Sequence, residues 1–166
     1  MRGSVAVVAA LLLLAAAPAN TARLPGGTVL DTPALAALIR AEHPLLIDVA
    51  PPPPRKPSGL AADTPWLPAP HSDIPGSVWL PDAGERAPSP ALARWFRARL
   101  AVLAGRPDRP LVFYCHIHCQ RSFDAALRAI DDGYSRVYWY PLGIEGWTEA
   151  GKPTAPAKPV PAEPVH

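Results

Sequence analysis

Three short, largely apolar runs recur along the chain, and the segments between them carry apolar residues at helical spacing. The runs are residues 45–50 (LLIDVA), 110–115 (PLVFYC) and 136–141 (RVYWYP). A strand can be apolar on both sides only where both faces of its sheet are covered by other elements. The alternation of such strands with helices therefore predicts an α/β fold with a doubly wound, central parallel sheet.

Capping residues and prolines predict where the helices begin. Asp31, followed by Thr32 and Pro33, predicts a helix to residue 42, and Ser89 with Pro90 predicts another to residue 104. Glu145 is interpreted as a solvated turn residue. The other expected elements are a helix over residues 122–132, an edge strand at 28–30, a turn and then a brief strand within 74–81, and a turn at 142–147 whose Trp147 packs on the body.

Proline is unusually frequent and marks segments without regular structure. Residues 51–73 hold many of the 24 prolines, and each proline removes a hydrogen-bond donor and restrains its neighbour. We interpret this stretch as a long Pro-rich surface insertion within one domain over residues 28–153; a linker between two domains is the alternative. The Pro-rich tail, residues 154–166, lacks apolar periodicity and is expected to be disordered.

The first 22 residues have the organisation of a secretory signal peptide. Arg2 precedes an apolar run over residues 5–17, and small residues near Ala19 and Ala22 offer cleavage sites. The run is shorter than the roughly 20 residues of a membrane-spanning helix. We therefore expect a periplasmic or secreted protein without stable membrane association after cleavage, with an uncleaved anchor as the alternative.

Charge gives no indication of a polyanionic partner. Without Arg2, the 16 basic residues fall to 15, against 14 acidic ones. A nucleic-acid-binding protein usually carries a basic excess or a basic cluster. We therefore expect no nucleic-acid partner.

The two cysteines of the chain, Cys115 and Cys119, lie in the segment YCHIHCQRS at residues 114–122. This segment directly follows a predicted strand and precedes a predicted helix. In a doubly wound sheet such a loop lies at the carboxyl edge, where ligand sites occur, often at a helix N-terminus. Its position therefore indicates a functional loop.

Longer segments of the chain resemble a known family. Four segments together resemble the rhodanese domain, in which a strand ends in the nucleophilic cysteine of an active-site loop. They are LLIDVA, HSDIPGSVWLP, LVFYC and RSFDAALRAIDDGYSRVYWYPLGIEGW. More closely, they resemble the secreted rhodanese-like proteins associated with PQQ-dependent catabolism, which are named after a CXXCW motif. In the pattern meant here, three residues separate the two cysteines, and a tryptophan follows the second cysteine. Gln120 stands where that motif has its tryptophan, and Ala50 stands where many rhodanese domains have arginine.

The resemblance implies a single rhodanese-like domain, Cys115 as nucleophile and an accessory role in PQQ-dependent alcohol oxidation. Physical chemistry supports the thiol independently, because a tight loop entering a helix gathers unpaired N–H groups and the positive end of the helix dipole. Such a cradle would stabilise a thiolate or persulfide and lower the cysteine pKa. A buried, inert Cys115 is the alternative. The expected catalytic residues are Cys115, Cys119 and Arg121, and the expected cradle residues are His116, Ile117, His118, Gln120 and Ser122.

The second thiol favours redox or persulfide-relay chemistry. An oxidising compartment favours joining of close thiols, and Cys119 could attack a persulfide on Cys115 as a disulfide forms. That bridge needs a non-helical loop, because helical positions four apart hold their Cβ atoms about 5–6 Å apart. We expect a sulfurtransferase or thiol oxidoreductase that acts with a small anionic or thiol substrate, or with a periplasmic redox protein.

Two other uses of the loop remain open. The loop has a cysteine, five residues and then an arginine, from Cys115 to Arg121. This is the pattern of cysteine phosphatases and arsenate reductases, in which the arginine binds a tetrahedral oxyanion. The loop could instead belong to a noncatalytic module that binds copper or another ligand. Thiolate and imidazole ligands suit Cu(I) or Zn(II), with copper as the candidate cofactor, and the candidate metal ligands are Cys115, Cys119, His118 and His71.

Fused to a reporter enzyme, residues 1–22 are expected to direct export, because their short apolar run has a basic flank and a small-residue exit. The measurement is reporter activity in the cytoplasmic and exported fractions, with the same reporter lacking these residues as control. Uncleaved full-length protein that remains soluble in the cytoplasm would contradict the prediction.

Overall fold

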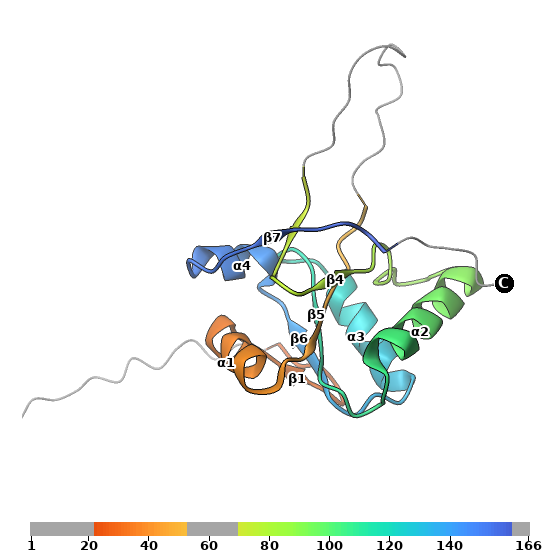
Figure 1. Ribbon diagram of the computed structural model, residues 1–166. Helices are drawn as coiled ribbons and strands as arrows, with labels where there is room; N and C mark the ends of the chain where they lie inside the picture. The colour runs from red at the N-terminus through yellow and green to blue at the C-terminus, as the bar shows by residue number, and fades with distance from the viewer. Residues whose placement is uncertain (1–21, 53–69, 161–166) are drawn as a thin grey trace, which may run out of the picture.

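The computed structural model describes residues 22–52 and 70–160, so the expected signal peptide, most of the Pro-rich insertion and the end of the tail lie outside the described residues. The central sheet is parallel throughout, with the strand order β1-β6-β5-β2-β4 (Figure 1). The expected α/β fold with a central parallel sheet is confirmed. The strands are β1 (Thr28–Val29), β6 (Val137–Tyr140), β5 (Leu111–Tyr114), β2 (Leu45–Asp48) and β4 (Val78–Trp79).

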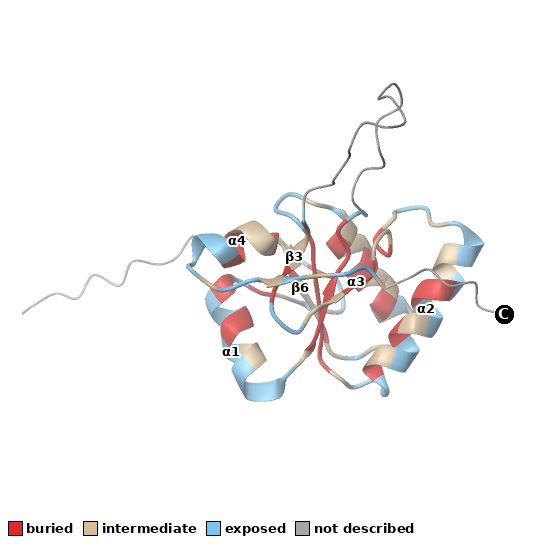
Figure 2. Ribbon diagram, turned by 45° about the horizontal axis from the view of Figure 1, so that its top comes forward, coloured by how far each residue is buried: buried red, intermediate tan, exposed pale blue. Residues whose placement is uncertain are grey.

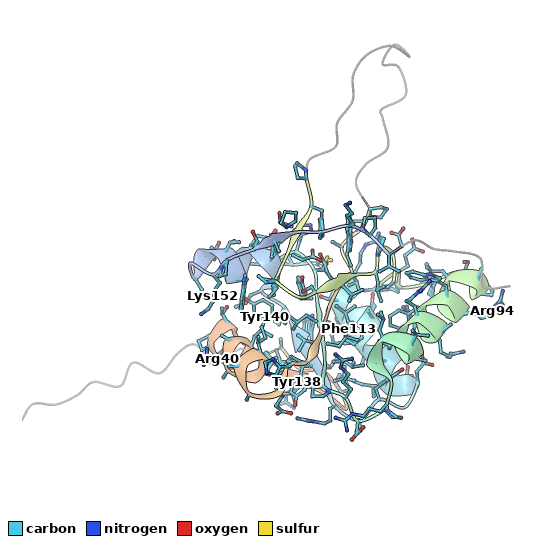
Figure 3. The ribbon with its side chains drawn as sticks, viewed as in Figure 1. Arg40, Arg94, Phe113, Tyr138, Tyr140 and Lys152 are labelled. Atoms are coloured by element: carbon cyan, nitrogen blue, oxygen red, sulfur yellow. The ribbon has the colours of Figure 1, made fainter. Side chains whose placement is uncertain are left out.

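Helices cover both faces of this sheet, as its apolar strands require. One face packs against α1 and α4, and the other against α2 and α3 (Figures 1 and 2). Phe113 lies on the side of α2 and α3, whereas Tyr140 lies on the side of α1 (Figure 3). Within the described ranges, no helix is long and apolar enough to cross a membrane. The helices are α1 (Thr32–Glu42), α2 (Pro90–Ala104), α3 (Arg121–Asp131) and α4 (Gly143–Glu149).

The first two helices begin at the caps that the sequence predicts. The side chain of Asp31 accepts a hydrogen bond from the backbone N–H of Ala34 at 2.8 Å. The hydroxyl of Ser89 accepts one from the N–H of Leu92 at 3.2 Å. Both caps are followed by a proline in the first turn, where its missing N–H costs the helix nothing.

The register of the central strands aligns their carboxyl ends. Asp48 at the end of β2 lies opposite Tyr114 at the end of β5, and Tyr114 lies opposite Tyr140 of β6. The segments that follow these strands therefore leave the same edge of the sheet. Cys115 follows β5 directly, so the cysteine loop begins beside the end of β2.

The interpretation of residues 142–147 as a turn is wrong, because most of them belong to helix α4. Glycine disfavours helices, and Gly143 and Gly146 concealed this one. Packing on the sheet overrides that propensity. Trp147 is buried as expected, and its indole N–H donates to the Pro153 carbonyl at 2.7 Å.

The expectation of a disordered tail is wrong for its first part. Strand β7 (Ala155–Pro156) pairs antiparallel with β3 (Ser72–Asp73), and residues 155–160 are here called the C-terminal strap. Prolines are compatible with an edge strand, where an absent N–H need not be paired. Further along the strap, the N–H of Ala157 donates to the His71 carbonyl (3.0 Å) and that of Val160 to the Trp79 carbonyl (2.9 Å).

Truncation after Thr154 is expected to lower the free energy of unfolding by on the order of 2 kcal/mol, because it removes β7 and the strap's backbone hydrogen bonds. Chemical denaturation monitored by circular dichroism measures the effect. The matched control is truncation after Val160, which keeps the whole strap and should unfold like the full chain. Equal unfolding midpoints for both truncations would show that the strap adds no stability.

Candidate active site

The cysteine loop, residues 115–120, joins β5 to α3 and is not helical. It turns back through a hydrogen bond from the N–H of Cys119 to the His116 carbonyl at 3.2 Å. His118 has a φ of 60°, a left-handed conformation that is uncommon outside glycine. Both cysteines are free thiols. The loop thus has the non-helical path that a bridge between them requires.

Helix α4 packs its first turn directly against this loop. The backbone N–H of Ile144 donates to the carbonyl of Cys115 at 3.0 Å. Gly143 has a φ of 62°, and a Cβ atom at that position would lie 2.5 Å from the same carbonyl oxygen. Only glycine fits such a contact. The helix that sequence reasoning missed therefore fixes where the loop begins.

Glu145 of α4 clamps the other side of the loop. Its Oε2 accepts the N–H of Ile117 at 2.8 Å, and its Oε1 lies 2.7 Å from Nδ1 of His116. Partial burial would raise the pKa of Glu145, but the hydrogen bonds from Ile117 and His116 outweigh it and lower that pKa. Glu145 is thus a structural clamp on the loop, and its interpretation as a solvated turn residue is wrong.

The two thiols share a hydrogen bond but occupy different surroundings. Cys115 is 1% exposed, whereas Cys119 is only partly buried. The hydrogen bond with Cys119 and burial raise the pKa of Cys115. The same hydrogen bond lowers the pKa of Cys119 to about 6; burial opposes this, and the backbone N–H groups of Arg121, His116 and Ser122 reinforce it. The hydrogen bond between the thiols and the backbone N–H groups around Cys119 thus favour the thiolate at the more exposed Cys119 over the buried Cys115.

Three backbone N–H groups, those of His116, Arg121 and Ser122, lower the pKa of the second thiol, Cys119. Cys115 still lies at the buried end of β5, one residue past the strand. Cys119 lies at the entrance to α3, where unpaired N–H groups and the helix dipole favour an anion. The pKa lowering that the sequence suggested for Cys115 thus falls on Cys119.

The predicted cradle residues differ in what their groups contact: the N–H groups of His116 and Ser122 lower the pKa of Cys119, whereas the N–H of Ile117 donates to Glu145. Ser122 is buried, and its hydroxyl donates to the Cys119 carbonyl at 3.3 Å while it accepts the indole N–H of Trp139 at 3.0 Å. It therefore supports the loop from the protein interior. The exposed members of the cradle are His116, Ile117, His118 and Gln120.

Arg121 is paired with a carboxylate from another loop. Its Nη1 donates to Oδ1 of Asp82 at 3.3 Å, and both side chains are 36% exposed. Arg121 and Gln120 also line a surface hollow of about 370 Å³. An anion at the cysteine loop would have to compete with Asp82 for this guanidinium, which disfavours the Cys-x5-Arg phosphatase interpretation.

A second polar cluster lies beside the loop at the end of β2. Nε2 of His71 is 2.6 Å from Oδ2 of Asp48 and 3.0 Å from Oδ1 of Asp73. The imidazole stacks on Trp79 with ring centroids 3.8 Å apart, and its centroid lies 6.4 Å from that of His116. Burial and the nearby Asp48 carboxylate raise the pKa of Asp73 to about 7. This cluster of Asp48, His71 and Asp73 is called the acidic triad below.

The sequence analysis singled out His71 but missed its two carboxylate partners. In the part of the chain that the structure describes, the acidic triad is the group with metal-ligand spacing, and it contains no sulfur. His71 therefore does not join Cys115, Cys119 and His118 in the expected ligand set. One signal was present, because Asp48 is the only charged residue of its apolar run; Asp73 gave no comparable signal.

Most of the chain matches the model of a known family. The family model described as a rhodanese-like domain matches residues 31–150. No curated protein matches the chain. Solved structures with a similar fold include a thiosulfate sulfurtransferase from Pseudomonas aeruginosa (21% identity, TM-score 0.51), a polysulfide-sulfur transferase homodimer from Wolinella succinogenes (19%, 0.50), and SseA from Escherichia coli, a 3-mercaptopyruvate sulfotransferase (19%, 0.52).

The lengths covered differ among these structures. The match to the thiosulfate sulfurtransferase covers 81% of this chain and 21% of the other. The match to the polysulfide-sulfur transferase covers 80% of both chains, and the match to SseA covers 82% of this chain and 54% of the other. At such identities the likeness shows the fold alone.

Glu145→Ala is expected to speed amide hydrogen exchange at Ile117, because that N–H loses its acceptor. Exchange rates measured by NMR at neutral pH test this, with Glu149→Ala at the exposed end of α4 as the matched control. The pKa of Glu145 is lowered in the folded chain, so its carboxylate stays ionised at pH values near the ordinary pKa of glutamate. In the wild type, the Ile117 amide should therefore remain protected from exchange as the pH falls through that range. Unchanged Ile117 exchange in Glu145→Ala would refute the clamp.

Proposed function

The chain belongs to the rhodanese-like domain family, and we propose that it performs a persulfide relay coupled to thiol redox chemistry at Cys115 and Cys119. The observation that carries this proposal is the pair of free thiols in one non-helical loop at the entrance to α3, of which Cys119 is the more exposed. The backbone N–H groups of Arg121, His116 and Ser122 lower the pKa of Cys119 below the ordinary thiol value, which raises its thiolate fraction at neutral pH. The partly exposed member of the pair is thus the one ready to react.

In the first step, the Cys119 thiolate attacks the outer sulfur of an anionic sulfur donor such as thiosulfate. An S–S bond forms to Cys119, the S–S bond of the donor breaks, and the remainder leaves with its electron pair as sulfite. The N–H groups of His116, Arg121 and Ser122, which favour the thiolate, can equally hold the charge of the persulfide.

In the second step, the sulfur of Cys115 attacks the Sγ atom of the Cys119 persulfide. The intramolecular disulfide forms, the terminal sulfur leaves with the electron pair, and the proton of Cys115 goes with it as HS⁻. A dithiol reductant then restores both thiols. The buried Cys115 is thus the resolving thiol, which reverses the order that the family resemblance implies.

The phosphatase alternative has weaker support. It requires Arg121 to bind the oxyanion, but this side chain pairs with Asp82. It also leaves the second thiol without a role. A noncatalytic binding module is the other alternative, and a purified protein that turns over no thiol, sulfur or phosphate substrate would favour it.

The setting of the reaction is also a proposal. The signal-peptide pattern of residues 1–22 supports export to the periplasm or beyond, where close thiols tend to be oxidised. The dithiol reductant would then be a periplasmic redox protein. The resemblance to the CXXCW-motif proteins supports an accessory role in PQQ-dependent alcohol oxidation.

Cys115→Ala is expected to trap a persulfide on Cys119 after incubation with thiosulfate, because the resolving thiol is gone. Mass spectrometry of the intact protein and of its peptides should find one added sulfur atom on Cys119. Cys119→Ser should take up no sulfur and release no sulfide. Arg121→Ala should slow sulfide release by about tenfold or less, through weaker attraction of the anionic donor.

Two results would contradict the relay as written. A persulfide that accumulates on Cys115 in Cys119→Ser would restore the order implied by the family resemblance. Phosphate-ester hydrolysis that survives Cys119→Ser, but is lost in both Cys115→Ser and Arg121→Ala, would replace the relay with the phosphatase function.

A further inference from the structure

The acidic triad brings two carboxylates and one imidazole together in the protein interior. Asp48 is 2% exposed and Asp73 is 3% exposed, and the imidazole is held between them. The facing ligand atoms of all three side chains lie within 4.8 Å of one another. Two carboxylates buried this closely repel each other unless a positive charge or a shared proton lies between them.

The three side chains do not satisfy one another. Nε2 of His71 carries at most one proton, and its shorter contact is with Asp48 at 2.6 Å. Among the described residues, neither carboxylate oxygen of Asp73 has a hydrogen-bond partner. A buried carboxylate without a donor is costly. The side chain of Asp73 thus faces the triad with only the 3.0 Å contact between its Oδ1 and Nε2 of His71, whose shorter contact is with Asp48.

We propose that the acidic triad is a binding site for a divalent transition-metal ion of the zinc type, separate from the two thiols. Two carboxylates and a neutral imidazole carry two negative charges, which such an ion neutralises. Oxygen and imidazole donors suit Zn²⁺ and neighbouring ions, at bond lengths of about 2.0–2.2 Å. Ligand atoms on one tetrahedral ion then lie about 3.4 Å apart, so the observed 2.6 and 3.0 Å contacts need to widen by less than about 1 Å.

The surroundings of the triad hold its ligand atoms in place. Oδ1 of Asp48 accepts the N–H of Ala50 at 2.8 Å, which leaves Oδ2 directed at His71. Trp79 stacks on the imidazole and is itself fixed by a hydrogen bond from its indole N–H to the Ala50 carbonyl at 2.8 Å. Such outer contacts orient metal ligands and are a regular part of metal sites.

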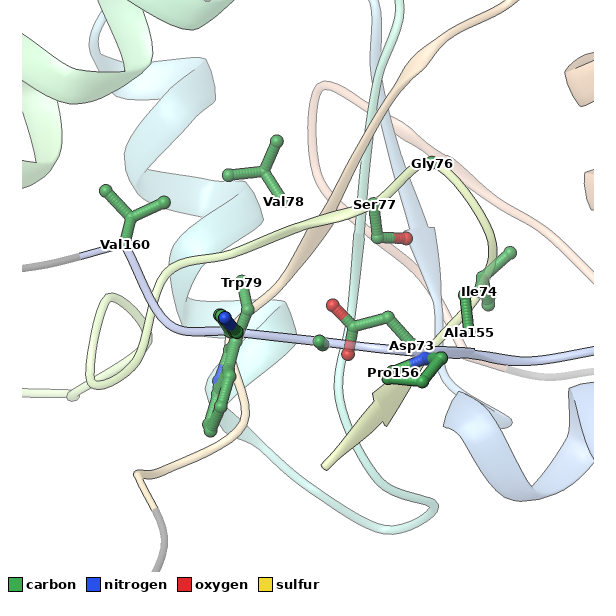
Figure 4. A pocket seen from close by; sticks show the side chains of 11 residues that line it. Asp73, Ile74, Gly76, Ser77, Val78, Trp79, Ala155, Pro156 and Val160 are labelled. Carbon is green, nitrogen blue, oxygen red and sulfur yellow. The ribbon is translucent and has the colours of Figure 1, made fainter. Parts of the chain in front are cut away.

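The triad is also reachable from the surface. A cavity of about 280 Å³ is lined by Asp73, Ser77, Trp79 and residues of the C-terminal strap (Figure 4). In the figure, the carboxylate of Asp73 lies between the strap and the chain that leads to Trp79. An ion could enter beneath the strap, and water in the cavity could supply the remaining coordination position.

Titration of the purified full-length protein with Co²⁺ tests the site, because its spectrum reports both binding and ligand type. The wild type is expected to develop visible d–d bands without the near-ultraviolet charge-transfer band of a thiolate ligand. Cys119→Ser should bind Co²⁺ equally well. Asp73→Asn should weaken binding by more than about 100-fold, whereas Asp108→Asn, which alters an exposed aspartate, should leave it unchanged.

Thermal unfolding separates loss of the site from loss of the fold. Asp73→Asn is isosteric and leaves one carboxylate instead of two in the buried triad, so without metal it should still unfold cooperatively near the wild-type temperature. Zn²⁺ should raise the unfolding temperature of the wild type and not that of this variant. The proposal is overturned by absence of Co²⁺ binding, by a thiolate band that disappears in Cys119→Ser, or by unchanged binding in a folded Asp73→Asn.

Discussion

The parallel register between β2 and β5 is the constraint on which both polar sites depend. It places Asp48 opposite Tyr114, and the N–H of Val49 extends the ladder by donating to the Tyr114 carbonyl at 3.1 Å. Because side chains alternate between the faces of a strand, a slip by one residue would move Asp48 to the other face. With the observed register, the acidic triad and the cysteine loop lie next to each other at the carboxyl edge of the sheet. The ring centroids of His71 and His116 are 6.4 Å apart.

Hydrogen bonding within the loop divides the backbone donors between two anions. Glu145 takes the N–H of Ile117, while three other N–H groups stabilise the Cys119 thiolate. The carboxylate clamp therefore shapes the loop without taking the donors that the sulfur needs. Cys115 lies on the buried side of the pair, where an incoming sulfur donor has little access.

The parts of the fold that depend on local pattern could be predicted from the sequence. The apolar runs around Ile47, Phe113 and Trp139 became parallel strands, and Asp31 and Ser89 capped helices as expected. The position of the cysteine loop after β5 followed from the same pattern.

The parts that depend on tertiary contacts could not be predicted. Helix α4 contains two glycines and is held by packing, and the strap is held by the edge of another strand. Which thiol ionises depends on the directions of N–H groups, and the spacing of Cys115 and Cys119 contains no such information. Asp73 meets His71 only because β3 turns it inward.

The central claim is that the two cysteines share a hydrogen bond and that Cys119 is the thiol that ionises first. Titration of the ¹³Cβ resonances of both cysteines by NMR, in the fully reduced protein, tests it most directly. The account predicts that Cys119 ionises first, with its pKa lowered to about 6, and that the pKa of Cys115 is raised above the ordinary thiol value. Ionisation of Cys115 first, or two independent titrations near the ordinary cysteine pKa, would contradict it.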